Sequence, residues 1–226
     1  MGWRSDQRFR AILAGATLAA VIALEPAPAH AKNEFSFGIG VGVFAFDDGV
    51  AYEGRALSYL SGLGADTGDS RRADWAVVPV LTQSWKFHEN LGVEVRERFW
   101  QSAARGRFDA NPGLDFRFAR SVVPFTLSLA ASVANNGNDA GVSLLAGPGL
   151  YVVSSDLRGF LGTEDSIAAR PGVLVSGGFF VRVSESLYVR GDVCWDWFDL
   201  PRTSELLKDG GNGGGFTVSG ILEYRM

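Results

Sequence analysis

The sequence predicts an all-β protein that forms an antiparallel transmembrane β-barrel, with eight strands as the preferred number. Three observations lead to this prediction. Apolar residues recur at every second position along most of the chain, long and short connections alternate between the resulting segments, and an export signal precedes them. Period-two alternation is typical of strands with one apolar face, whereas an amphipathic helix repeats every 3.6 residues.

The first 31 residues have the organisation of a secretory signal peptide. Three arginines precede an apolar run at 11–24, and the Ala-His-Ala triplet at 29–31 matches a cleavage site. The run is shorter than the roughly 20 residues that a membrane-spanning helix needs. We therefore expect a cleaved signal peptide over 1–31 and one barrel domain over 32–226.

Composition excludes several classes of protein. The chain has a net charge of −4, which becomes −5 without the three Arg, one Asp and one Glu of residues 1–31. A mildly acidic chain has no electrostatic basis for binding nucleic acid. Cys194 is the single cysteine, so an internal disulfide framework is excluded. An exported chain of this kind is either a soluble periplasmic protein or an outer-membrane barrel.

Eight segments alternate with a period of two. The final segment shows the pattern well, because Phe216, Val218, Leu222 and Tyr224 share one face while the other face is mostly polar. Such alternation indicates a strand with one side in an apolar environment and one side in a polar environment. The predicted strands lie within 35–46, 74–87, 91–100, 121–133, 141–153, 172–183, 187–198 and 216–226.

The connections between these segments are unequal. Short ones lie at 88–90, 135–139 and 184–186, and long ones rich in Gly, Asp, Ser and Arg lie at 47–73, 101–120, 154–171 and 199–215. Transmembrane barrels have short periplasmic turns and long extracellular loops, and an even strand number places both termini in the periplasm.

One segment leaves the strand number open. Leu114, Phe116 and Phe118 alternate with charged residues, like a further strand. Counting it separately, together with 157–161, gives ten strands. The preferred interpretation keeps eight and makes 114–118 an extension of the next strand through a bulge near Arg120 and Ser121, where the apolar positions change from even to odd numbers.

Aromatic residues and charges distinguish a membrane barrel from a soluble β-sandwich, which remains the alternative. Trp75 and Trp85 share an apolar face, and a tilted strand of that length rises ~25 Å, the height of a barrel's apolar band. The predicted aromatic girdles contain Trp75, Trp85, Trp195, Trp197 and Tyr224. Charges of both signs occupy the opposite, inward faces. The predicted polar network of the lumen contains Glu94, Arg96, Arg98, Arg182, Arg190, Asp192, Asp196, Glu223 and Arg225.

The signal peptide, the eight alternating segments, the loop rhythm and the amphipathic last strand resemble the small outer-membrane barrels of Gram-negative bacteria (OmpA-, OmpX- and OmpW-like). The resemblance covers 32–226. It implies a multi-pass outer-membrane protein in contact with lipid and lipopolysaccharide, monomeric, and inserted by the barrel-assembly machinery. In that superfamily the last strand usually ends in Phe or Trp, whereas this chain ends with Tyr224, Arg225 and Met226.

The sequence contains no convincing catalytic, metal or cofactor site. His88 is the single histidine after residue 31, and it falls in a predicted periplasmic turn. We expect it to be a solvated turn residue. Three functional hypotheses remain: a structural or surface-binding barrel whose lumen is filled with side chains, a narrow channel for ions or small solutes, and an enzyme that modifies outer-membrane lipids.

Overall fold

The computed structural model describes residues 34–46, 62, 75–88, 90–107, 115–134, 139–159, 162–199 and 213–226. In this part of the chain the β elements are β1 (Glu34–Phe46), β2 (Trp75–His88), β3 (Leu91–Arg98), β4 (Trp100–Arg107), β5 (Asp115–Ala134), β6 (Ala140–Gly159), β7 (Gly162–Arg182), β8 (Leu187–Phe198) and β9 (Gly215–Arg225). The signal peptide predicted over 1–31 lies outside these residues. Among the residues described, no helix has the length and apolar character needed to cross a membrane.

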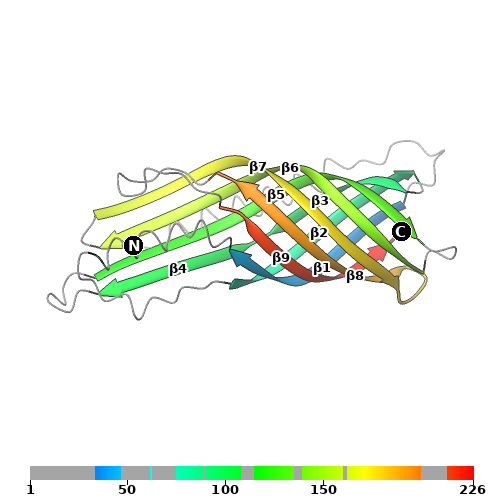
Figure 1. Cartoon of the computed structure of the whole chain (residues 1–226), viewed down its shortest axis with the longest axis horizontal. Helices are drawn as coiled ribbons and strands as arrows, with labels where there is room; N and C mark the ends of the chain where they lie inside the picture. The colour runs from blue at the N-terminus through cyan, green and yellow to red at the C-terminus, as the bar shows by residue number, and fades with distance from the viewer. Residues whose placement is uncertain are drawn as a thin grey trace.

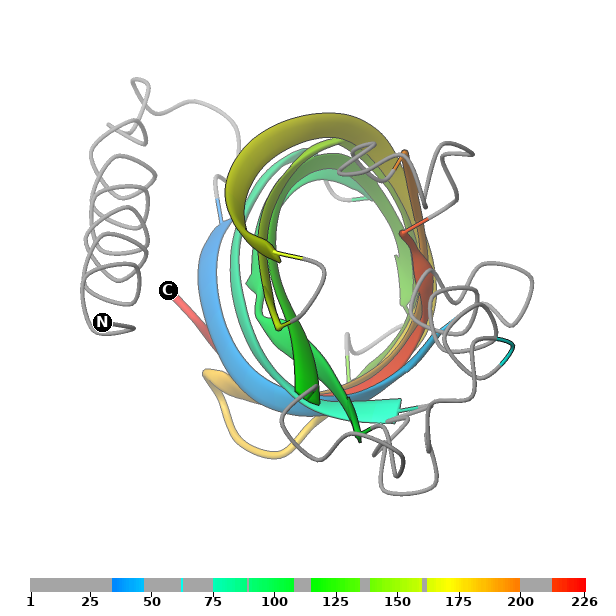
Figure 2. The ribbon, with the colours of Figure 1, turned by 90° about the vertical axis from the view of Figure 1, so that its left-hand side faces the viewer.

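One antiparallel sheet closes on itself (Figures 1 and 2). Strands that follow one another in sequence pair with each other, except β3 and β4, and β9 returns to pair with β1. β3 and β4 both pair with β5, and the pairs Glu97–Phe125 and Trp100–Val122 belong to a single register. β3 and β4 are therefore two parts of one strand. With β3 and β4 counted as one, the closed sheet has eight strands, which confirms the preferred strand number. The alternatives of ten strands and a β-sandwich are wrong.

Prolines surround the interruption at Phe99. The β2–β3 ladder ends at Val80–Arg98, so the next position places Pro79 opposite Phe99. On the other side, Pro124 follows the last β3–β5 pair, Glu97–Phe125. Proline has no N–H group to donate to a ladder. The two prolines therefore explain why β3 ends here and why its continuation, β4, separates from β2.

Side chains alternate between the two faces of the barrel wall. In β9 every second residue is buried, from Thr217 to Arg225, and the residues between them are exposed. The exposed set is apolar and includes Phe216, Val218, Leu222 and Tyr224. An outward apolar face and a mixed, buried inward face are the arrangement expected for a barrel wall between lipid and a filled lumen.

Three strands extend far beyond the rest of the barrel, at the left of Figure 1. β5, β6 and β7 have 20, 20 and 21 residues, whereas β1, β2, β8 and β9 have 11 to 14. With β4 they form a four-stranded extension at the end away from the short turns. We call the opposite end, where β2 meets β3 and β7 meets β8, the short-turn end.

The extension corrects two predicted loops and one predicted bulge. β6 runs to Gly159 and β7 starts at Gly162, so most of 154–171 is strand, and 101–120 likewise contains β4 and the start of β5. Pairing of β5 with β6 runs unbroken through Arg120 and Ser121, so the bulge is wrong. Residues 101–107 and 154–171 lie beyond the part of the wall that has an apolar outward face, so their sequence lacks the expected alternation, whereas Phe116 and Phe118 at the start of β5 retain it. The predicted loops at 47–73 and 199–215 lie mostly outside the described residues.

Glycines in β1 allow the inward side chains of β9 and β2 to lie close to its backbone. A Cβ atom placed on Gly40 would lie 2.8 Å from Cγ1 and 2.9 Å from Cα of Ile221, and one on Gly42 would lie 2.9 Å from the Cβ of Ser219. These glycines accommodate the side chains of the adjacent strands.

Replacing Gly40 with leucine should destabilise the barrel by about 1–3 kcal/mol, because the new side chain overpacks the lumen against Ile221. The matched control is Gly220→Leu. A Cβ at Gly220 faces outward and meets no atom within 4 Å. Urea unfolding in detergent, followed by the heat-modifiable mobility of the barrel on gels, measures both variants. Equal stability of the two variants would contradict the packing argument.

Candidate functional site in the barrel lumen

β3 and β8 face each other across the lumen. In the closed ring β2, β1 and β9 separate them on one side and β5, β6 and β7 on the other, so they lie diametrically opposite. Their inward side chains nevertheless meet. Arg96 Nη2 lies 2.6 Å from Asp192 Oδ2, and Arg190 Nη1 lies 2.6 Å from Glu94 Oε2. Charged side chains therefore span the full width of the lumen.

Arg190 is the centre of this network. Its guanidinium donates to Glu94 from the opposite wall at 2.6 and 3.0 Å, to Asp192 on its own strand at 2.7 Å, and to Glu223 on β9 at 3.4 Å. Arg96 donates to Glu94 at 2.9 Å and lies 2.6 Å from the sulfur of Cys194. These charges are almost fully buried. Buried charges are tolerated when they are paired and hydrogen-bonded, as they are here.

Asp196 and Arg98 together connect β3, β6, β8 and β9, next to this network on the side of the extension. Its two oxygens accept from Arg98 Nη1 at 2.7 Å and Nη2 at 2.5 Å, which is a bidentate pair. Asp196 also accepts from the hydroxyl of Tyr151 on β6 at 2.7 Å. Arg98 in turn donates to Thr217 on β9 at 3.2 Å. The carboxylate of Asp196 is completely buried, at 0% exposure.

An aromatic layer closes the lumen above Asp196, toward the extension. Phe44 stacks on Trp100 with ring centroids 4.2 Å apart, and Tyr151 stacks on Phe198 at 4.3 Å. The surrounding buried residues are Val78, Val80, Val122 and Val153. This layer differs from the sequence-based expectation, in which the inward face is polar along the whole length of each strand. One feature of the sequence does indicate this layer. The apolar positions change from even to odd numbers near Arg120, and the even-numbered Val122 faces inward.

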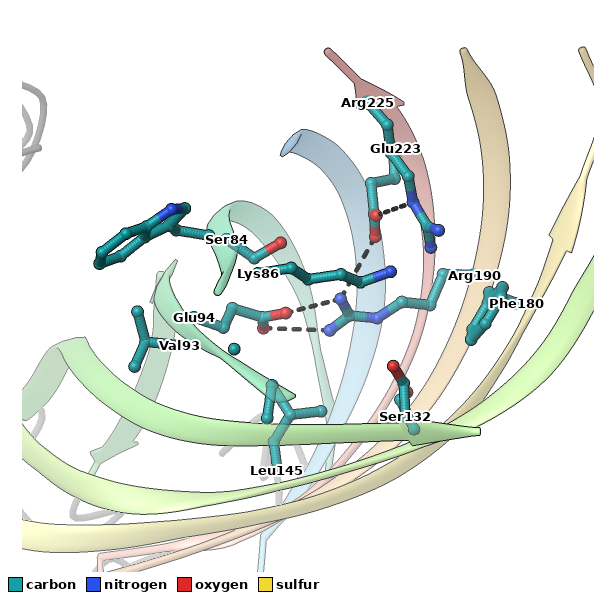
Figure 3. A pocket seen from close by; sticks show the side chains of 14 residues that line it. Ser84, Lys86, Val93, Glu94, Ser132, Leu145, Phe180, Arg190, Glu223 and Arg225 are labelled. Atoms are coloured by element: carbon teal, nitrogen blue, oxygen red, sulfur yellow. Dashed lines mark hydrogen bonds and ion pairs between the residues drawn. The ribbon is translucent and has the colours of Figure 1, made fainter. Parts of the chain in front are cut away.

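A small cavity lies at the short-turn end of the lumen (Figure 3). Its volume is about 40 Å³. Arg225 covers one side of it, with its guanidinium carbon 3.6 Å from the ring centroid of Tyr188 and 4.8 Å from that of Phe180. The Nε of Arg225 lies 2.7 Å from Glu223 and 3.3 Å from Glu34.

The structure brings together eight of the nine residues predicted for the lumen network. Arg182 lies elsewhere. It is the last residue of β7, so it reaches the turns at the rim, where it contacts Asp139 at 3.4 Å and the carbonyl of Ser184 at 3.1 Å. Three residues outside the predicted network, Tyr151, Thr217 and Cys194, complete the hydrogen bonds of the buried charges.

Four of the predicted girdle residues have described side chains, and all four are on the outward face. Trp85 and Tyr224 lie toward the short-turn end, where Trp85 packs edge-on against Phe87 with centroids 6.1 Å apart. Trp195 and Trp197 lie toward the other end of β8. The side chain of Trp75 lies outside the described part of the structure.

The described residues contain no cluster of three or more His, Cys, Asp or Glu that could hold a metal ion. His88 ends β2 at the short-turn end, where it is exposed and its Nδ1 accepts from the backbone N–H of Asn90 at 3.4 Å. The lumen carboxylates Glu94, Asp192 and Asp196 are all engaged by arginines. The charged side chains of the lumen therefore neutralise one another and obstruct the lumen.

Removing the carboxylate of Asp196 should destabilise the protein by about 3–5 kcal/mol, because Asp196→Ala leaves Arg98 buried without its partner. The matched control is Asp156→Ala, which breaks a partly exposed pair with Arg158 in the extension and should cost at most about 1 kcal/mol. Combining Asp196→Ala with Arg98→Met should recover part of the loss. Urea unfolding in detergent measures all three variants, and no recovery in the double variant would contradict the unpaired-charge explanation.

Comparison with known proteins reveals similarity of fold. No family model matches the chain, and no curated protein matches it. Among solved structures, a major outer membrane protein from Thermus thermophilus has a TM-score of 0.51 at 12% identity, covering 87% of this chain and 100% of that chain. OprG from Pseudomonas aeruginosa has a TM-score of 0.49 at 14% identity, with 88% and 98% covered. Neisserial surface protein A has 0.47 at 12%, with 84% and 96% covered. The closed eight-stranded sheet and the Thermus thermophilus match together show that this chain has the β-barrel fold of outer-membrane proteins.

Proposed function

We propose that the protein is a structural or surface-binding barrel of the outer membrane, with a lumen closed by its own side chains. The observation that carries this proposal is the contact between β3 and β8. Arg96 with Asp192 and Arg190 with Glu94 join opposite walls of the barrel. Eight strands enclose a space that side chains can fill, and these side chains do fill it.

The outward face supports a position in a lipid bilayer. Ile39, Val41, Leu129 and Val175 are each about half exposed, and residues like them surround the barrel. In water so large an exposed apolar surface would lead to aggregation, whereas hydrocarbon accommodates it. We accordingly propose lipid and lipopolysaccharide as the surroundings of this face. We further propose residues 1–31 as the export signal, insertion by the barrel-assembly machinery, and a monomer as the functional unit. The short-turn end then faces the periplasm.

The extension formed by β4 to β7 is the part of this barrel that would stand above the outer leaflet. Its strands remain paired in regular register as far as Gly159 and Gly162. A paired sheet gives a more ordered binding surface than a flexible loop, because less conformational entropy is lost on binding. This supports surface binding as the role, in preference to transport.

The two other hypotheses have less support. A channel requires a continuous polar path, whereas the aromatic layer of Phe44, Trp100, Tyr151 and Phe198 lies in series with the charged network. An enzyme that uses His88 would place its histidine at the periplasmic rim, where it is solvated and contacts Asn90. We therefore propose a role that is not enzymatic.

The purified protein should be silent in planar lipid bilayers, because two barriers obstruct its lumen in series. Phe44→Ala with Trp100→Ala removes part of the first barrier, and Glu94→Ala with Arg190→Ala removes a balanced pair from the second. Each double variant should remain silent, while the quadruple variant should conduct. Steady conductance of the unaltered protein would overturn the closed-lumen proposal and favour the channel. Extraction without detergent would overturn the membrane assignment.

A further inference from the structure

The cavity at the short-turn end is lined by three cationic side chains. Its charged residues are Lys86, Arg190 and Arg225 together with Glu94 and Glu223. Glu34 is a third carboxylate near these cations, 3.7 Å from Lys86 and 3.3 Å from Arg225. Figure 3 shows the side chains of Lys86, Arg225 and Arg190 extending into the same space from different strands. Cationic side chains that converge on one cavity favour an anionic ligand wherever their carboxylate partners leave donors unused.

Two of these cations retain donors that the described contacts do not use. Lys86 Nζ forms one long ion pair, 3.7 Å from Glu34, and its side chain is 24% exposed, so the ammonium has further donors to offer. Arg225 reaches its two carboxylates through Nε, which leaves its terminal nitrogens for another acceptor. Arg190 differs, because both of its terminal nitrogens donate to Glu94 and Asp192. An ammonium group has three donors and a guanidinium has five.

A buried hydroxyl adds a neutral donor to the same cavity. Ser143 lines the cavity, is only 9% exposed, and its Oγ has no hydrogen-bond partner. Buried polar atoms in folded proteins are nearly always hydrogen-bonded, so the hydroxyl of Ser143 is available to a water or ligand in this polar cavity. A cavity of about 40 Å³ has room for roughly three waters or for one small charged group.

We propose that this mouth binds one oxyanion, the carboxylate or phosphate group of a periplasmic solute. Lys86 and Arg225 supply the charge, Ser143 supplies a hydroxyl donor, and Glu94 and Glu223 hold Arg190 away from the ligand. The site depends on the orientation of the barrel but not on the surface role of the extension. Because each charge-assisted hydrogen bond contributes modestly in a wet site, we expect affinity in the millimolar range.

Isothermal titration calorimetry of the purified protein in detergent micelles tests the proposal. Sodium phosphate and sodium acetate are the two probes, with sodium chloride at equal ionic strength as the reference. Saturable binding of one or both is expected, and the stronger probe identifies phosphate or carboxylate as the natural group. Lys86→Gln and Ser143→Ala should each weaken binding, by about tenfold for Lys86→Gln. Lys86→Arg should retain it.

Arg182→Gln is the matched control, because Arg182 is a cation at the same end that contacts Asp139 and does not line the cavity. Its affinity for the probes should equal that of the unaltered protein. Circular dichroism and heat-modifiable gel mobility establish that each variant forms the barrel. No saturable binding of either probe, or binding that Lys86→Gln leaves unchanged, would overturn the proposal. Neither outcome affects the bilayer test, so the closed-lumen proposal stands or falls separately.

Discussion

Charge pairing between opposite walls is the interaction on which the rest of this structure depends. Arg96 with Asp192, Arg98 with Asp196 and Arg190 with Glu94 join β3 to β8 through the centre of the barrel. These residues can meet only when the sheet is closed and the strand register is correct. A register shift of one residue would turn every one of these charges toward the apolar exterior. The network therefore favours one register strongly, even though buried ion pairs contribute little net stability compared with apolar packing.

The lumen is divided into two environments, and the division explains the use of residues along each strand. Toward the short-turn end the inward positions are charged, as in Glu94, Arg190 and Glu223. Toward the extension they are aromatic or aliphatic, as in Trp100 and Val122. Asp196 lies between the two, where it binds the guanidinium of Arg98 and the hydroxyl of Tyr151. A tyrosine suits this boundary because its ring packs with the aromatic layer while its hydroxyl reaches the charges.

Strand prediction succeeded where the outward face of the wall is apolar and failed in most of the extension. In β9 the outward residues Phe216, Val218 and Leu222 must be apolar, so the period of two is visible in the sequence. Residues 154–171 need no apolar outward face, because most of them belong to the extension. There β6 and β7 pair with each other, and β7 has no contact in register with β8 before Gly172. The expected bulge near Arg120 failed for a related reason, since the lumen itself becomes apolar at Val122 and reverses the pattern without any extra residue.

By itself, the sequence determined the strands with one apolar face and the side of each strand that carries the charges, and it favoured a barrel of eight strands, because these follow from periodicity and from the order of long and short connections. Only the tertiary structure decided which charges pair. Arg190 and Glu94 are 96 residues apart, and no local pattern relates them. The tertiary structure also decided that an aromatic layer closes the lumen and that Lys86, Arg225 and Ser143 share one cavity. Such contacts depend on the curvature and closure of the sheet, which bring together side chains from strands that are distant along the chain.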